Sequence, residues 1–180
     1  IGFAVQTHSL ISGNYIKPLV TVIALANAQL AFSCAAPIIV NSLTPGSTFT
    51  TFDEAMDAFA LCNPGDNVLI RLDGVLSGLS IPLAAVDLPY IIQSSKTLTI
   101  EGPAARDVRI DTVVDNQHMF LVQESASLVL NNIDLDGGDT GNRTLSGIQV
   151  TSAAAGLTLN NTQMKDFVAS SGNGAAINTA

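Results

Sequence analysis

The chain has no tryptophan, few charged residues and very few basic ones. Charged residues make up 12% of the 180 positions, and only seven are Lys or Arg, so that the formal net charge is −8. The basic residues are scattered along the chain rather than clustered. Because binding to phosphates requires clustered Lys and Arg, the sequence argues against nucleic acid and against anionic membrane surfaces as partners.

Cysteine and histidine are too few for the common metal and catalytic sites. The chain has two of each, which leaves no His/Cys cluster for zinc and no Ser-His-Asp arrangement. A Gly-rich phosphate loop is also missing. We therefore expect no catalytic residue in this segment, and no cofactor other than the calcium ion considered below.

The first forty residues are, in contrast, strongly apolar. Lys17 precedes a mostly apolar run over residues 19–30, and small residues follow it. This layout is typical of a secretory signal peptide, and the run is too short and too interrupted by polar residues for a membrane span. We predict an N-terminal extension and signal peptide over residues 1–36, cleaved after Ala28 or between positions 33 and 36. The alternative is an apolar helix that caps the domain.

Export bears on how the two cysteines are interpreted. An oxidising compartment permits a disulfide between Cys34 and Cys62, which, if Cys34 survives cleavage, would tie the start of the mature chain to the first helix. The alternative is a pair of unrelated thiols. We therefore predict a secreted or cell-surface protein in which this pair is a candidate disulfide.

A short helix is predicted at "TTFDEAMDAFALCNPGD". Thr51 can act as its N-cap, with Glu54 three residues later completing a capping box. The apolar residues of this stretch follow helical spacing and form one stripe, made of Phe52, Ala55, Met56, Phe59 and Ala60. Turn residues at 63–66 end the helix, so residues 37–66 are predicted to form an N-terminal cap.

After residue 66 the spacing of apolar residues changes from that of a helix to that of a strand. Four segments align on Val68, Leu98, Leu128 and Leu157, in steps of 30, 30 and 29 residues. In each segment a second apolar residue follows two positions later, as in a half-buried strand. A fixed period of this length is typical of a solenoid.

The composition of the repeat indicates strands rather than helices. Its units are rich in Gly, Asn, Thr and β-branched residues, and a second apolar series repeats with the same period, at Phe120/Val122, Ile148/Val150 and Ile177. Several short strands in each unit suit an all-β right-handed parallel β-helix. We predict that residues 67–180 form its rungs and that the chain is a fragment, truncated at the C-terminus.

In a β-helix each residue stacks on its counterpart one rung away. The repeated "LNN" then marks successive rungs, with Leu128 and Leu130 beside Leu157 and Leu159 in the core. The matching asparagines are predicted to stack at a corner, where Asn tolerates αL dihedrals and can hydrogen-bond along the column. These asparagines are Asn131 and Asn132 in one rung, and Asn160 and Asn161 in the next.

Several short motifs follow one another between residue 38 and the end of the chain. "TFDEAM" lies in the predicted capping helix, "GDNVLI" and "LTIEGP" in the first two strand segments, and "LVLNNIDLDGG" and "GNGAAI" in later units. Their order resembles the N-terminal part of bacterial surface and secreted β-helix proteins of the pectate-lyase-like superfamily. The resemblance implies an adhesin, an autotransporter passenger or another outer-membrane or cell-surface protein. A minority of the superfamily cleaves acidic polysaccharides.

The densest group of polar residues is "DLDGGDTGNR", which begins at Asp134. Asp134 and Asp136 are expected on one face of a strand, with Asp139 in the loop that follows. Carboxylates suit Ca²⁺, although this spacing fits neither an EF-hand nor an RTX repeat. We name these three as candidate calcium ligands; the alternative is a solvated loop. The turn before them is interpreted as carrying a surface pair of Arg106 and Asp107.

These features predict a non-catalytic, exported β-helix segment of a bacterial surface or secreted protein, which serves as an adhesive or structural display scaffold. The alternative is the N-terminal part of a polysaccharide-active, pectate-lyase-like enzyme whose site lies partly beyond residue 180. Expected partners are host or surface glycans or proteins, with no nucleic acid and no membrane span in the mature segment. The oligomeric state is not predicted.

Overall fold

Three parallel β-sheets form the framework of the chain that the structure describes. The structure is a computed structural model, and it describes residues 34–43, 50–83, 87–112, 117–137, 147–167 and 176–179. Except for its last three residues, the predicted leader at 1–36 lies outside these ranges. No helix within the ranges has the length and apolar character of a membrane span.

The three sheets are named here after the strands β2, β4 and β3 that each of them contains. The β2 sheet contains β1 (Ile38–Val40), β2 (Asn67–Leu72), β5 (Thr97–Glu101), β8 (Ser127–Asn131) and β11 (Gly156–Asn160). The β4 sheet contains β4 (Tyr90–Ile92), β7 (Phe120–Val122), β10 (Ile148–Val150) and β13 (Ile177–Thr179). The β3 sheet contains β3 (Ser80–Leu83), β6 (Arg109–Thr112), β9 (Asp134–Asp136) and β12 (Gln163–Lys165). The helical elements with bounds among the described residues are α1 (Phe52–Ala60) and the 3₁₀ turn η1 (Gly74–Leu76).

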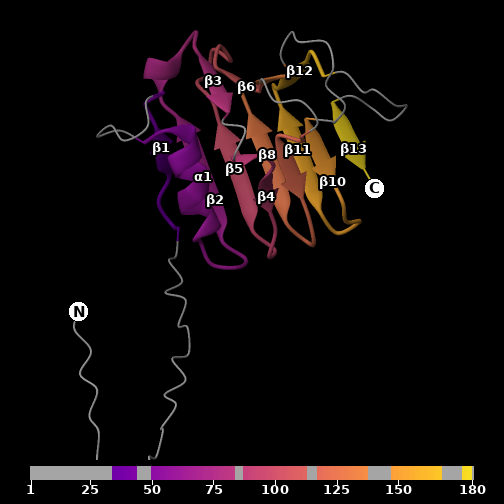
Figure 1. The fold of residues 1–180 in the computed structure, drawn as a ribbon. Coiled ribbons are helices and arrows are strands. Elements are labelled where there is room, and N and C mark those ends of the chain that lie inside the picture. The colour runs from indigo at the N-terminus through magenta and orange to yellow at the C-terminus, as the bar shows by residue number, and fades with distance from the viewer. Residues whose placement is uncertain are drawn as a thin grey trace, which may run out of the picture. The chain divides into compact units, whose positions relative to one another are not determined.

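The chain visits the three sheets in turn and repeats the circuit, which is the topology of a parallel β-solenoid of about four turns (Figure 1). The strand register matches the sequence repeat: Val68 pairs with Leu98, Leu98 with Leu128, and Leu128 with Leu157. The all-β parallel β-helix with one short helix near its N-terminal end is therefore confirmed. A right-handed sense of winding, expected of crossovers between parallel strands, stays a prediction.

The strands of the β3 sheet form a third series that the repeat analysis did not single out. Their inward residues are Ile81, Ile110, Leu135 and Met164, which are register partners. The steps between them are 29, 25 and 29 residues, so one step is shorter than the period of the other two series. These strands also carry few apolar residues each, which weakens the alternating pattern.

The core consists of the inward columns of the three sheets. Leu98, Leu128 and Leu130 are fully buried, because rungs cover them on both sides. Leu157 and Leu159 pack against the core but are only partly buried, since no described rung of this sheet follows them. Their predicted place in the column holds, while complete burial does not.

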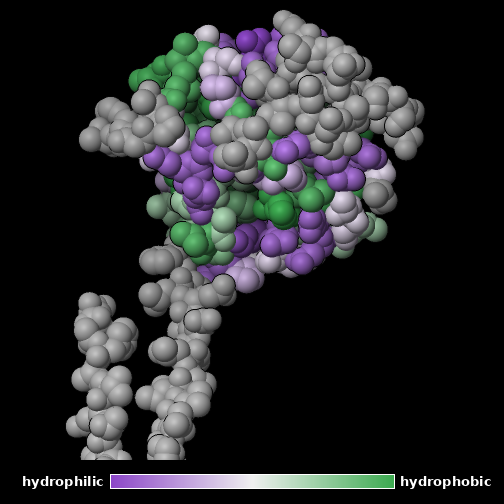
Figure 2. Space-filling model, viewed as in Figure 1, coloured by the Kyte–Doolittle hydropathy of each residue, from purple (hydrophilic) through white to green (hydrophobic). Residues whose placement is uncertain are grey.

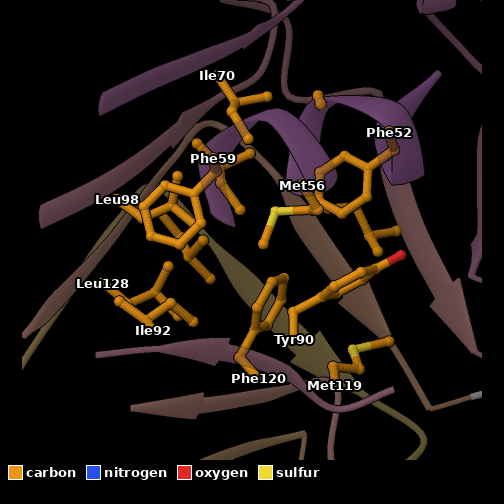
Figure 3. Close-up of a cluster of buried hydrophobic side chains, with 14 of the residues drawn as sticks. Phe52, Met56, Phe59, Ile70, Tyr90, Ile92, Leu98, Met119, Phe120 and Leu128 are labelled. Atoms are coloured by element: carbon orange, nitrogen blue, oxygen red, sulfur yellow. The ribbon is translucent and has the colours of Figure 1, made fainter. Parts of the chain in front are cut away.

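Helix α1 covers the N-terminal end of this core. Its N-cap is Thr51, and a complete capping box joins Thr51 and Glu54, as the sequence predicts. Phe52, Met56 and Phe59 point toward the side chains of the first rungs (Figure 3). Ala60, which we assigned to the apolar stripe, is exposed, because the stripe turns away from the solenoid in the last turn of the helix.

Lys96 fastens the other end of α1. The last turn of the helix holds no basic residue. Instead, the Lys96 ammonium donates to the carbonyl oxygens of Phe59 and Ala60, at 3.3 and 3.0 Å, and lies 5.1 Å from the centre of the Phe59 ring. Burial lowers the pKa of Lys96, and the charge of Asp66 acts in the opposite direction. A cation at this place suits the negative end of the helix dipole.

Tyr90 connects the start of α1 to the β4 sheet. Its ring packs edge-on against Phe52 and beside Phe120 in the core, and its hydroxyl donates to the Asp53 carboxylate in the first turn of the helix (Figure 3). Burial is the main cause that raises the pKa of Tyr90, and the hydrogen bond to Asp53 adds to it.

A glycine at a corner provides a test of the stacking. A Cβ on Gly102 would lie 2.2 Å from the backbone oxygen of Asn132 in the next rung, whereas a Cβ on Gly74 would meet nothing within 4 Å. We predict that Gly102→Ala lowers the free energy of unfolding by about 1–3 kcal/mol, because the rungs must move apart. Urea unfolding of both variants measures this. An equal effect of Gly74→Ala would contradict the packing argument.

The raised pKa of Tyr90 predicts how stability depends on pH. The unfolded chain releases the tyrosine proton near pH 10, about the ordinary pKa, whereas the folded chain keeps it to higher pH. The free energy of unfolding therefore falls as the pH rises above about 10. A Tyr15→Phe variant leaves Tyr90 as the single tyrosine. Its ultraviolet absorbance should stay that of the neutral phenol until the protein unfolds. Ionisation of Tyr90 in the folded protein near pH 10 would contradict the prediction.

Candidate functional site

The outward face of the β3 sheet gathers the predicted carboxylates. In β9, Leu135 points into the core, so Asp134 and Asp136 point outward, on one face as predicted. In the register, Asp134 lies between Arg109 and Gln163, and Asp136 lies between Asp111 and Lys165. Sequence-distant charges thus become neighbours because strands of successive rungs run side by side.

Asp136 is a buried carboxylate held by two cations. Its side chain is 7% exposed, and its Oδ2 lies 3.1 Å from Arg109 Nη1 and 3.1 Å from Lys165 Nζ. Lys165 also lies 3.8 Å from Asp166. A carboxylate this deeply buried is stable in its ionised form only when such partners offset its desolvation.

Asp134 has a different set of partners. Its Oδ1 lies 3.3 Å from Arg106 Nε and accepts a hydrogen bond from the backbone N–H of Gln163. Arg106 therefore pairs with Asp134, a rung away, and its neighbour Asp107 accepts a hydrogen bond from Ser77 instead. The predicted pair of Arg106 and Asp107 is wrong, because the turn directs the two side chains to different partners.

A polar hollow of about 250 Å³ lies over this face. Three basic side chains contribute to its lining, namely Arg106, Arg109 and Lys165. This concentration is notable in a chain with seven basic residues and a net charge of −8. The lining also contains the carboxylates of Asp107 and Asp134, so the hollow carries mixed charge rather than a strong field of one sign.

One carboxylate of this face is incompletely bonded. Asp111 Oδ2 accepts a hydrogen bond from Ser80 Oγ at 3.5 Å, but its buried Oδ1 has no hydrogen-bond partner among the described residues. Asp111 is the register partner of Asp136. The sequence reasoning missed Asp111, since no second carboxylate stands near it in its strand and only the register brings it beside one.

The calcium assignment stays a prediction. Asp134 and Asp136 each contact a cationic side chain, and Asp139 lies outside the described residues. Within the described ranges no group of three or more His, Cys, Asp or Glu side chains could hold a metal ion. Oδ2 of Asp136 is in contact with both Arg109 and Lys165.

The repeated asparagines form two ladders at a corner of the solenoid. The side-chain amide of Asn160 donates to the side-chain Oδ1 of Asn131 at 2.8 Å, and that of Asn161 donates to Oδ1 of Asn132 at 2.9 Å. Asn132 and Asn161 have φ angles of 54° and 48°, the αL region that Asn tolerates. These residues hold rungs together, and no ligand is needed to explain them.

A disulfide joins Cys34 and Cys62, whose Cα atoms are 5.6 Å apart. It links the segment before β1 to Cys62, which lies just after the end of α1 at Ala60. The Asp66 carboxylate accepts backbone hydrogen bonds from both joined segments, from the N–H of Cys34 at 3.3 Å and from the N–H of Asn63 at 3.0 Å. The cap is thus fixed covalently and by hydrogen bonds.

Comparisons with protein-family models, with curated proteins and with solved structures gave no match. The parallel β-solenoid follows from the strand pairing alone, and these comparisons assign no family to the chain.

The buried carboxylate gives a prediction with a matched control. Arg109→Met leaves Asp136 with one cation fewer, and we expect a loss of about 1–3 kcal/mol of unfolding free energy. Arg71→Met removes an exposed partner of Glu101, 3.2 Å away, and should cost about 0–1 kcal/mol. Urea unfolding at neutral pH compares the two. Equal losses would show that the pair at Asp136 has no special weight.

Proposed function

We propose that the chain is an exported segment of a bacterial surface or secreted protein, and that it serves as an adhesive or structural display scaffold. The observation that carries this proposal is the bonding of outward polar side chains between rungs. Arg71 pairs with Glu101, and the hydroxyls of Ser95 and Ser125 lie 2.6 Å apart. Side chains that bond to each other in this way stabilise the stack of rungs, and their polar groups are not free to bind a substrate.

Export is supported by the disulfide. Disulfides form and persist in oxidising compartments, outside the cytosol of most organisms. Cys34 is four residues beyond the end of the apolar run at 19–30, so it is retained in the mature chain when cleavage follows Ala28, and it is bonded to Cys62.

Right-handed winding and membership of the pectate-lyase-like superfamily are the finer part of the proposal. The right-handed winding is supported by the general handedness of crossovers between parallel strands. Superfamily membership is supported by where the motifs fall: "LTIEGP" covers most of β5 and the corner at Gly102, and "LVLNN" covers β8 and the asparagine corner. Both motifs therefore lie at the same corner of the solenoid, in two successive rungs.

A polysaccharide-active enzyme is the second candidate function. The observation that favours it is the pairing of Asp111 with Asp136 on the outward β3 sheet, with one oxygen of Asp111 unbonded. Glycosidases use two carboxylates, and in retaining enzymes these lie about 5 Å apart, similar to the spacing of adjacent strands. Against it stands the engagement of Asp136 with Arg109 and Lys165.

Export and catalysis are tested on one preparation. The full chain, preceded by an initiator methionine, is expressed in a bacterial host, with a Lys17→Glu variant that removes the positive charge before the apolar run. We expect processed protein outside the cytoplasm without free thiols, and retention of the variant. The purified protein should leave polygalacturonate intact with or without calcium.

Two results would overturn these proposals. Retention of the unprocessed parent chain in the cytoplasm would contradict export. Cleavage of polygalacturonate that is lost in Asp111→Asn would replace the scaffold with the enzyme, because that substitution keeps the shape of the side chain and removes only its charge.

A further inference from the structure

A groove of about 240 Å³ lies between the second half of α1 and strand β4, away from the β3 sheet. Its apolar walls come from Met56, Phe59 and Ala60 on the helix side and from Pro89, Tyr90 and Ile91 on the strand side. Ile91 is 47% exposed. Apolar residues gather in Figure 2 where Figure 1 places β4, with hydrophilic residues around them.

The size of the groove suits one long side chain rather than a whole small molecule. Pockets for drug-sized ligands usually hold about 300–1,000 Å³, and a water molecule accounts for about 30 Å³. A volume of about 240 Å³ therefore holds several waters, or the stem and head of one extended side chain.

The charge of the groove selects the kind of side chain. Asp57 and Asp87 line it and are exposed, and neither forms an ion pair with another described residue. None of the described residues that line the groove is basic. The charges of Asp53, Asp87 and Asp57 also contribute to the raised pKa of Tyr90, after the larger effect of burial, which is consistent with a negative potential here. A cationic group complements these features.

Strand β4 offers a free backbone edge beside the groove. β4 is the end member of its sheet among the described strands and pairs only with β7. The Tyr90 N–H donates to Met119, and the Ile92 carbonyl accepts from Gln123, both in the direction of β7. Because backbone groups alternate along a strand, those of Ile91 face the opposite edge, where an added strand could bond to them.

We propose that this groove binds a lysine or arginine side chain of an extended segment in a partner protein, and that the segment adds as a strand to the free edge of β4. The aliphatic stem of the side chain lies on Met56 and Ile91, and its charged head lies between Asp57 and Asp87. Backbone bonds to Ile91 supply the generic part of the affinity, and the groove supplies the selectivity. The inference goes beyond display and does not depend on it.

The test uses the full chain and two labelled, end-blocked peptides, Thr-Val-Lys-Val-Thr and Thr-Val-Glu-Val-Thr. Fluorescence anisotropy should show binding of the lysine peptide and at least about tenfold weaker binding of the glutamate peptide. Asp57→Asn with Asp87→Asn should weaken the lysine peptide roughly tenfold, as expected for two exposed charge pairs. Hydrogen exchange of the Ile91 amide should slow when the peptide binds.

The matched control is Asp107→Asn with Asp166→Asn, which removes the same charge from the turns beside the β3 sheet and should leave peptide affinity unchanged. All these substitutions are at exposed positions, and circular dichroism verifies that the variants fold. No binding of the lysine peptide at millimolar concentration, equal affinity for the two peptides, or equal effects of the two double variants would overturn the proposal. An Ile91 amide that gains no protection would overturn strand addition.

Discussion

The in-register pairing of parallel strands between rungs is the constraint on which the rest of this structure depends. It places each residue beside its counterpart about 30 positions away, as Leu98 lies beside Leu128. In the β2 sheet the inward apolar residues Val68, Leu98, Leu128 and Leu157 therefore meet one another, and the core continues from rung to rung. The same constraint acts on the outside, where Glu101 stands between Arg71 and Asn131.

A stack of this kind needs a cover where the first rung would expose the core. Helix α1 supplies it, and three attachments hold the helix in place: the bond of Tyr90 to Asp53, the contacts of Lys96 with the last carbonyls, and the disulfide of Cys62. Each attachment joins the helix to a part of the chain about 28 to 37 residues away. The cap is therefore tied to the first rungs at both of its ends.

The outer faces of the solenoid differ in what they have available for partners. On the β3 sheet, the cations and carboxylates bond to each other across rungs, with Asp136 as the most deeply buried member. Beside α1 and β4 the arrangement is the reverse, with apolar walls, two exposed carboxylates and a strand edge. A scaffold of stacked rungs can carry such distinct surfaces because each face uses every third strand.

The sequence by itself determined the repeat, the strand period, the capping box of Thr51 and Glu54, and the stacking of the asparagines, because these depend on spacing along the chain. It did not reveal the third strand series, with its shorter step, or the partners of Arg106 and Asp136, which are set by register and by the directions in which corners turn side chains. The attachment of Lys96 to α1, the unbonded oxygen of Asp111 and the groove beside β4 were likewise decided by tertiary structure alone. Local patterns encode which residues stack, whereas contacts between different faces and the cap arise only when the rungs have closed around one core.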